Sequence, residues 1–552
     1  MKIKNLLALL SLACVLLFAS CKQEQSNAIP DHLKVIPSSS TFVLSINAKD
    51  IVDKGDLDKF KNLNLYKLAK EELADRDAKA FKFMESFLSN TRSSGLNLDQ
   101  IYMFMQQLGE YQSLVAFTFG VSNSSKLEKW LNEAKKVNNE FEEAEIIKGE
   151  GFHKFRMDRS TLLIWDDTKA LLLMISEYDE DRYPSPESLL TIDDEHSIVA
   201  DTNFMASYNN RKDVTMWFSI EKIANRSWEM REVREQLPAL YEYLEDVRNA
   251  SFDISLAFEK GEATMSMSVW PADFIEKYNA KYPILKTDFD ESLYTYFPDK
   301  NYFVAKFSLN IQEYYKMLVD AFDKIVEGQE WDENEYQNME KAAAILKSDS
   351  IANIVNIFKG DVLGSITGFQ DGAIPIPYFA VGLTVNGEES FEQLAALIQQ
   401  GLGIELQKQG SYYAYPIEED MNIYFAYKDD IVYITNQETA RESFYKQGFE
   451  NNISSSDISS QLKNSILYYY LNLNFNNYPA TISATVNSAA AYSGYGMFSN
   501  VLSKLSDLSL TYQGGNTYNL TLKLKDNDEN ILKTIVKVID EFAKTALQSR
   551  SF

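Results

Sequence analysis

The chain has 552 residues and a formal net charge of -26, because 80 Asp and Glu outnumber 54 Lys and Arg. Hydrophobic residues make up 45% and charged residues 24%, which excludes a largely disordered chain and a multi-span membrane protein. The acidic balance excludes a nucleic-acid-binding protein, because phosphate contacts need a cationic surface. At this length we expect two or more domains.

The first residues have the pattern of an export signal. Lys2 and Lys4 precede an apolar run from Leu6 to Phe18 that only Ser11 interrupts. This run is too short to span a bilayer comfortably and has the length of a signal-peptide core, so we predict a signal peptide over residues 1–20.

The run ends in Leu17-Phe18-Ala19-Ser20-Cys21. Small residues directly before a Cys resemble the lipobox of bacterial lipoproteins, in which the Cys is lipidated and becomes the first residue of the mature protein. Phe18 departs from the Leu that is usual three positions before that Cys. We predict lipidation of Cys21; the alternative is a soluble secreted protein cut at the same small residues.

The residues after Cys21 bear on its location. Residues 21–30 form a polar tether with a single acid, Glu24, whereas surface-exported lipoproteins of Bacteroidetes commonly carry an acidic run there. We therefore expect a cell-envelope protein anchored to the outer membrane and facing the periplasm. Loss of Cys14 with the signal peptide leaves no disulfide within the mature chain.

The body of the chain has a pattern that occurs twice. Apolar residues alternate over 42–46, 115–121 and the hairpin 162–175, and again over 303–309, 379–385 and the hairpin 423–435. A second module also recurs, with a strand, a helix and a hairpin over 214–269 and again over 466–524. Alternation in strands with helical spacing between them predicts an antiparallel α+β fold.

The predicted organisation is an internal duplication, A-B-A'-B', of antiparallel sheets with amphipathic helices packed on one face. The first repeat covers 31–280 (A 31–195, B 196–280), and the second covers 281–552 (A' 281–458, B' 459–552). Pro-containing 178–190 and the Asn- and Ser-rich 448–461 are predicted to be exposed connectors.

Motifs for catalysis and cofactors are weak. None of the three His residues lies in a recognisable catalytic context, and no His-Glu-x-x-His zinc motif occurs. Ser460 and Lys463 match Ser-x-x-Lys, but no Lys-Thr-Gly follows, and the Gly-rich stretch 360–368 lacks the Lys of a phosphate loop. We predict no catalytic residue, cofactor or metal site.

Three acidic or amide side chains precede the final helix. Asp526, Asp528 and Asn530 have the spacing of a calcium loop, but Ile531 and Lys537 stand where that loop needs Gly and Glu. We expect these residues to cap the helix that begins near 531.

Clusters of Tyr are the candidate ligand contacts. The residues concerned are Tyr412, Tyr413, Tyr415, Tyr468, Tyr469 and Tyr470. Three consecutive Tyr in a strand point to both faces, so we expect at least one to be exposed, and exposed Tyr near carboxylates suits sugar or protein recognition. The alternative is that these Tyr residues fill sheet faces because of their high β-propensity.

The opening of the mature chain resembles a known family. Ile-Pro-x-His at 29–32, then Ser-Ser-Thr-Phe-Val-Leu-Ser-Ile-Asn at 39–47 and a Lys-containing helical start, is similar to Bacteroidales lipoproteins grouped as domain of unknown function 4836. The resemblance covers most of the mature chain and implies no known activity or site residues.

Three functions are compatible with these patterns. The first is a non-enzymatic binding or scaffold module held to the membrane by its lipid, with an envelope protein or a glycan as partner. The second is a carboxylate-dependent hydrolase such as a glycosidase, which needs only two acids at a set distance. The third is a carrier of a lipid or hydrophobic peptide.

Overall fold

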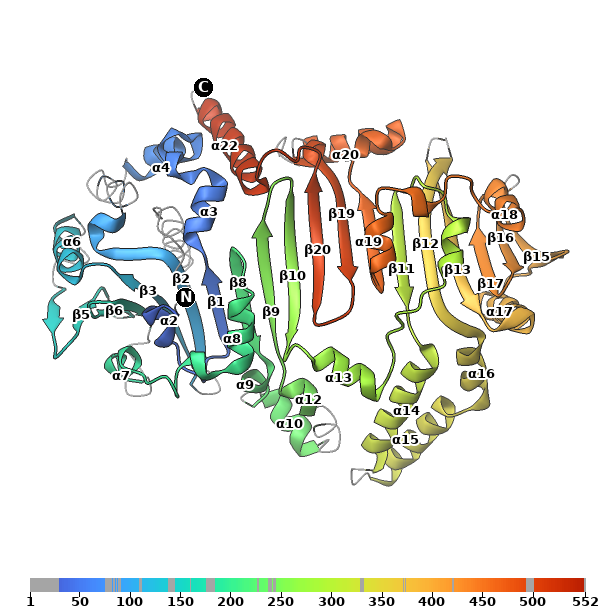
Figure 1. The fold of residues 1–552 in the computed structure, drawn as a ribbon, viewed down its shortest axis with the longest axis horizontal. Coiled ribbons are helices and arrows are strands. Elements are labelled where there is room, and N and C mark those ends of the chain that lie inside the picture. Colours follow the sequence, from blue (N-terminus) through green and yellow to red (C-terminus); the bar gives the residue numbers. More distant parts are fainter. Residues whose placement is uncertain are drawn as a thin grey trace. The chain divides into compact units, whose positions relative to one another are not determined.

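The structure is a computed structural model, and the chain divides into two compact units. Figure 1 labels their strands and helices. Unit 1 comprises Met1–Arg231, Asp246–Pro271 and Asp526–Phe552, and unit 2 comprises Glu232–Glu245 and Ala272–Lys525. The residues that the structure describes are 29–74, 82, 85, 87, 91–108, 112–137, 144–158, 160–174, 184–225, 228–236, 241, 245–327, 332–370, 372, 374–418, 421–492 and 501–550.

Unit 1 is built on an antiparallel sheet with the strand order β4-β5-β6-β7-β3-β2-β1-β8-β9-β10. The strands are β1 (Phe42–Ile46), β2 (Leu96–Gln107), β3 (Ser113–Val121), β4 (Ile146–Lys148), β5 (His153–Arg156), β6 (Thr161–Trp165), β7 (Lys169–Met174), β8 (Val214–Ser219), β9 (Ser251–Phe258) and β10 (Glu262–Trp270). Its helices are α2 (Asp31–Lys34), α3 (Ala48–Gly55), α4 (Asn64–Ala74), α6 (Ser124–Val137), α7 (Pro186–Leu190), α8 (Thr202–Asn209), α9 (Ile220–Ala224) and α22 (Ile531–Arg550).

Unit 2 has an antiparallel sheet in the order β14-β15-β16-β17-β13-β12-β11-β18-β19-β20, which matches unit 1 strand for strand. The strands are β11 (Phe303–Ser308), β12 (Phe358–Gln370), β13 (Ile376–Val385), β14 (Gln407–Gln409), β15 (Tyr412–Glu418), β16 (Met421–Lys428), β17 (Ile431–Thr435), β18 (Leu467–Asn472), β19 (Leu505–Tyr512) and β20 (Thr517–Leu524). Its helices are α13 (Phe274–Lys281), α14 (Ile311–Glu327), α15 (Glu333–Leu346), α16 (Asp349–Ile357), α17 (Gly387–Leu402), α18 (Glu438–Tyr445), α19 (Ser459–Asn464) and α20 (Ala480–Tyr492), while α10 (Trp228–Gln236) and α12 (Glu245–Arg248) lie where the units divide.

The α+β class and the predicted hairpins are confirmed. The prediction that helices pack on one face is wrong, because α8 packs on the face of Trp217 and α6 packs on the opposite face, with Phe117. The predicted hairpin 162–175 forms β6–β7 as far as Met174, where the described residues end, and 423–435 forms β16–β17. The hairpins β9–β10 and β19–β20 place Ile254 opposite Met267 and Leu510 opposite Leu520. Period-two alternation across a short turn was therefore sufficient to fix these pairings.

The prediction of exposed connectors is wrong for parts of both stretches. Residues 178–183 lie outside the described part, but Leu189 and Leu190 are buried on α7. In the second stretch Ile453 is fully buried, and α19 begins at Ser459. Pro and Asn favour turns in these segments, but they do not prevent the neighbouring apolar side chains from being buried in the core.

The covered face of the unit 1 sheet is rich in polar side chains. Asp253 on β9 accepts a hydrogen bond from the indole of Trp270 at 2.5 Å, and Trp217 on β8 donates to Ser251 at 3.2 Å. The helix α8 packs over this face, where Phe204 meets Trp217 edge-on at 5.4 Å between ring centroids. These polar groups remain buried because each has a partner.

The end of the chain returns to unit 1, whereas the predicted repeats had assigned it to the second half. The side chain of Asn530 accepts from the Leu532 amide at 2.9 Å, which caps α22, and donates to the Phe258 carbonyl at 2.9 Å. Leu532 and Val536 of α22 then pack against Ile51 and Val52 of α3. The predicted capping of the helix is thereby confirmed for Asn530, whereas the side chain of Asp526 accepts from the Asp528 amide, which lies before the helix, at 2.9 Å.

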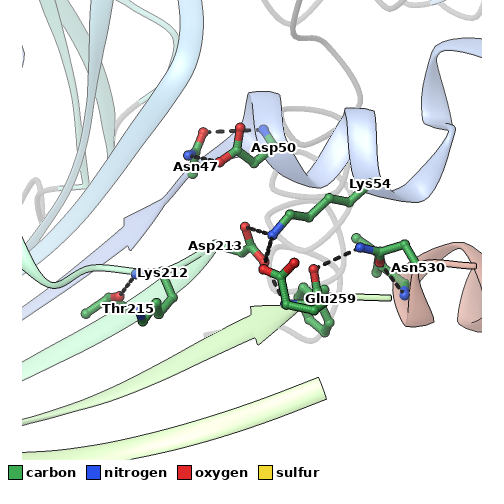
Figure 2. Close-up of polar contacts among 10 residues, drawn as sticks. Asn47, Asp50, Lys54, Lys212, Asp213, Thr215, Glu259 and Asn530 are labelled. Atoms are coloured by element: carbon green, nitrogen blue, oxygen red, sulfur yellow. Dashed lines mark hydrogen bonds and ion pairs between the residues drawn. The ribbon is translucent and has the colours of Figure 1, made fainter. Parts of the chain in front are cut away.

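An ion pair between half-buried Lys54 and buried Asp213 stabilises the same region (Figure 2). Lys54 on α3 donates to both oxygens of buried Asp213 at 2.9 and 3.0 Å, and to Glu259 at 3.0 Å. Asp213 also accepts from the Phe258 amide at 2.7 Å. Burial alone would lower the pKa of Lys54, but its hydrogen bonds to Asp213 and Glu259 raise that pKa above its usual value.

We expect Asp213→Ala to lower the free energy of unfolding by about 2–3 kcal/mol, because it leaves the Lys54 ammonium and the Phe258 amide without their buried acceptor. The matched control is Glu259→Ala, which removes an exposed partner of the same lysine and should cost less than about 1 kcal/mol. Urea unfolding of the two variants measures the difference. Equal losses would contradict the assignment of Asp213 as the anchor.

Candidate ligand-binding face

The side of the unit 1 sheet opposite α8 is apolar across β1, β2, β8, β9 and β10; within the described residues we refer to it as the open side. We call it the apolar face of unit 1; it comprises Phe42, Leu44, Met103, Met105, Met216, Phe218, Phe252, Ile254, Leu256, Met265, Met267 and Val269. Five of the chain's 15 Met residues lie on it. Met is flexible and polarisable, and it is over-used on surfaces that accept varied apolar ligands.

Strand register places these side chains together. Phe42 lies opposite both Met105 and Phe218, and Ile254 lies opposite both Met216 and Met267. Directly opposed residues of antiparallel strands point to the same face, so the set is continuous. The rings of Phe42 and Phe218 lie 5.0 Å apart, and those of Phe218 and Phe252 stack at 4.8 Å.

Exposure on this face is greatest on β10, the last strand of the unit 1 sheet, while helices cover parts of its border. Met265 and Met267 are 38% and 45% exposed, and the other members are half-buried. Leu127 and Leu131 of α6 share a core cluster with Phe117 of the neighbouring strand β3. At another border, α22 and α3 pack against Ile46 and Val214.

Unit 2 has an apolar face at the corresponding place. It comprises Phe303, Phe307, Val362, Ile366, Leu467, Tyr469, Leu471, Leu508, Leu510, Leu520 and Leu522 on β11, β12, β18, β19 and β20. Leu471 is 38% exposed and the others are half-buried. Sequence analysis identified the alternation in these strands but not which side of the sheet is covered.

The two predicted Tyr clusters, one on β15 and one on β18, are far apart in unit 2. Five strands separate β15 from β18 in the sheet, which corresponds to roughly 29 Å at about 4.8 Å per strand. The Tyr residues of β15 and those of β18 therefore do not form one site.

The Tyr residues of β15 pack under helices on both faces. Tyr413 is buried beside Phe391 of α17 and donates to Glu392 at 2.5 Å, a hydrogen bond that raises the pKa of the Tyr413 hydroxyl. Half-buried Tyr415 belongs to the same cluster. On the other face, the Arg441 guanidinium lies 4.5 Å from the centre of the Tyr412 ring.

The Tyr residues of β18 divide between the two faces. Tyr468 and Tyr470 belong to the covered core; Tyr468 is fully buried, and burial raises the pKa of half-buried Tyr470 to about 12. Tyr469 is half-buried on the apolar face, between Ala305 and Leu510. The expectation that at least one of the three is exposed is wrong, because Tyr468 is buried and Tyr469 and Tyr470 are half-buried.

A buried lysine on β11 is the most unusual titratable group in unit 2. Lys306 is 2% exposed, donates to the Leu462 carbonyl at 2.9 Å and lies 4.4 Å from the centre of the Phe289 ring. Burial lowers the pKa of Lys306 from 10.5 to about 8, against the opposing influence of Glu291 and Asp361. No pattern in the sequence indicates this burial, since a lysine between Ala305 and Phe307 is expected to point to solvent.

The three His residues pack against aromatic rings or pair with an acid. His32 is buried, which lowers its pKa to about 4, and its ring lies 5.3 Å from that of Tyr102. The ring of His153 stacks on Trp165, and exposed His196 pairs with Asp193.

No group of three or more His, Cys, Asp or Glu in the described part of the chain is arranged to hold a metal ion. Cys21 lies outside the described residues.

Comparison with known proteins defines the family. A family model described as "Domain of unknown function (DUF4836)" matches residues 32–532. The chain belongs to this family. No curated protein and no solved structure matches the chain. Of the helices in the described ranges, none combines the length and the apolar character needed to cross a membrane.

Lys306→Met should raise the free energy of unfolding at pH 7 by about 1–3 kcal/mol, because it removes a buried charge. The pKa of Lys306 is lower in the folded chain than in the unfolded chain, so wild-type stability rises between about pH 8 and 10.5. The gain from Lys306→Met therefore shrinks over that interval. Urea unfolding at several pH values tests this, with the exposed Lys300→Met as control; a pH-independent gain would contradict it.

Proposed function

We propose that this protein is a lipid-anchored envelope protein whose two units bind hydrocarbon chains on their apolar faces, as a non-enzymatic binding module. The observation that carries the proposal is the composition of those faces. Phe, Met, Ile and Leu occupy the open side of the central strands, whereas the covered side mixes Ser, Thr, Asp and Lys with buried apolar residues such as Val43, Trp217 and Tyr468. Covering each 100 Å² of such a face contributes about 2.5 kcal/mol to binding.

The chemistry of the face favours a hydrocarbon chain over an extended peptide. The backbone groups of β1, β8 and β9 are paired with neighbouring strands on both sides. The face therefore offers no partner for peptide amides, and each buried amide left unpaired would cost about 1–3 kcal/mol. An acyl chain has no such groups, and the flexible Met side chains adapt to its shape.

The size of the face suits several acyl chains or one lipid with two chains. Strands of six residues and four inter-strand spacings give an area of roughly 20 by 20 Å. Because acyl chains are apolar throughout, they match a face that holds no charged side chain among its members.

The proposed location rests on the N-terminal sequence. The apolar run over 6–18 and the small residues before Cys21 support lipidation of that Cys and residence in the outer membrane, on its periplasmic side. A lipid anchor would keep the apolar faces close to a source of acyl chains.

The duplication is also part of the proposal. The matching strand orders of units 1 and 2, together with the recurrent sequence pattern, support an origin by duplication of one ten-stranded half. The two apolar faces would then be two copies of one ancestral binding surface.

Binding is tested with the mature chain carrying Cys21→Ala and a fluorescent fatty acid that palmitate displaces. Met267→Glu and Leu471→Glu each place a charge on one apolar face. We expect each variant to lose part of the binding and the double variant to bind at least about tenfold more weakly. Ile345→Glu, an exposed position on α15, is the control. Unchanged binding by the double variant would contradict the proposal.

The anchor is tested separately by fractionation of cells. We expect Cys21→Ala to move the protein from the membrane to the soluble fraction, because the thiol that carries the lipid is gone. Cys14→Ala changes the other cysteine, within the predicted signal peptide, and should leave the protein on the membrane. Added protease should not reach the protein in intact cells, and digestion there would place it on the surface.

A further inference from the structure

The C-terminal helix α22 is fixed along one side and bare along the other. Asp540 accepts hydrogen bonds from Asn64 at 2.9 Å and from the Leu65 amide at 3.0 Å, which ties the helix to α4. Ile531 and Val538 are buried against unit 1. The helix is therefore held in a defined orientation on its own unit.

The bare side carries a large apolar stripe. Ile535, Ile539 and Phe542 are 40%, 40% and 43% exposed and follow one another at helical spacing. An amphipathic helix with such a stripe lies in the interface of a bilayer, with its apolar side chains among the acyl chains.

The charge of the helix differs from that of the chain as a whole. The α22 sequence has four basic residues and two acidic ones, in a protein of net charge -26. Lys533 pairs with Asp56 and Glu529, and Lys537 pairs with Glu529, so part of this charge is already compensated. Exposed Lys544, near the end of the helix, carries a charge that an anionic lipid surface can pair.

We infer that α22 docks unit 1 onto the bilayer through Ile535, Ile539 and Phe542. Unit 1 begins close to the predicted lipid, because residues 21–30 span at most about 35 Å when fully extended. The helix then sets the orientation of unit 1, which a flexible tether alone leaves free. This inference goes beyond the binding of hydrocarbon chains and does not require it.

The test uses the mature chain with Cys21→Ala, so that no lipid anchor contributes. Flotation is measured with vesicles of phosphatidylethanolamine and phosphatidylglycerol. We expect the chain with wild-type α22 to float with the vesicles. The triple variant Ile535→Ser, Ile539→Ser and Phe542→Ser should bind the vesicles at least about tenfold more weakly. Tyr314→Ser with Leu318→Ser, at exposed apolar positions on α14, is the matched control and should float like wild type.

A second measurement does not depend on the triple variant folding. In the Phe542→Trp variant, brominated lipids should quench more Trp fluorescence than they do in the parent chain, because the new indole enters the bilayer. Absence of flotation by the parent chain, equal flotation by the triple variant, or no added quenching would overturn the inference. Binding of the fluorescent fatty acid by the triple variant stays intact, which separates this result from failure of the proposed function.

Discussion

Successive side chains of a β-strand point to opposite faces, and the rest of this structure depends on how that constraint is used in the central strands. On β9, Ser251, Asp253 and Ser255 lie on the covered side, and Phe252 and Ile254 lie on the open side. On β11, Lys306 is covered while Phe303 and Phe307 are half-buried. A shift of register by one residue would exchange the two sets, so the pairing of the strands decides which face can take an apolar ligand.

This arrangement has a thermodynamic consequence for each face. The covered polar groups need partners, which Trp270 supplies to Asp253 and the Leu462 carbonyl supplies to Lys306. The charge on Lys306 still opposes folding, since burial disfavours it. On the open side, apolar surface stays in contact with water, and in the proposed function a hydrocarbon chain would end that unfavourable exposure by covering it. Under that proposal, stability and ligand binding are set by the same alternation.

Sequence patterns predicted the strands and hairpins well, because period-two alternation and turn residues are local. The same locality explains the cap at Asn530, whose side chain needs only the amide two residues on. Three features could not be predicted. Alternation does not say which side of Ile254 is covered, a lysine such as Lys306 normally points to solvent, and no local pattern shows that α22 returns to pack on α3. All three depend on contacts between residues distant in the sequence.

The central claim is that hydrocarbon chains lie on the open side of the central strands. The most direct test is photo-crosslinking of a diazirine-bearing fatty acid to the mature chain, followed by mass spectrometric mapping of the labelled peptides. The account predicts labels on β8, β9 and β10 at Met216, Ile254 and Met267, and on β18 and β19 in unit 2, all removed by excess palmitate. Labels confined to other segments, or labelling that palmitate does not compete away, would contradict it.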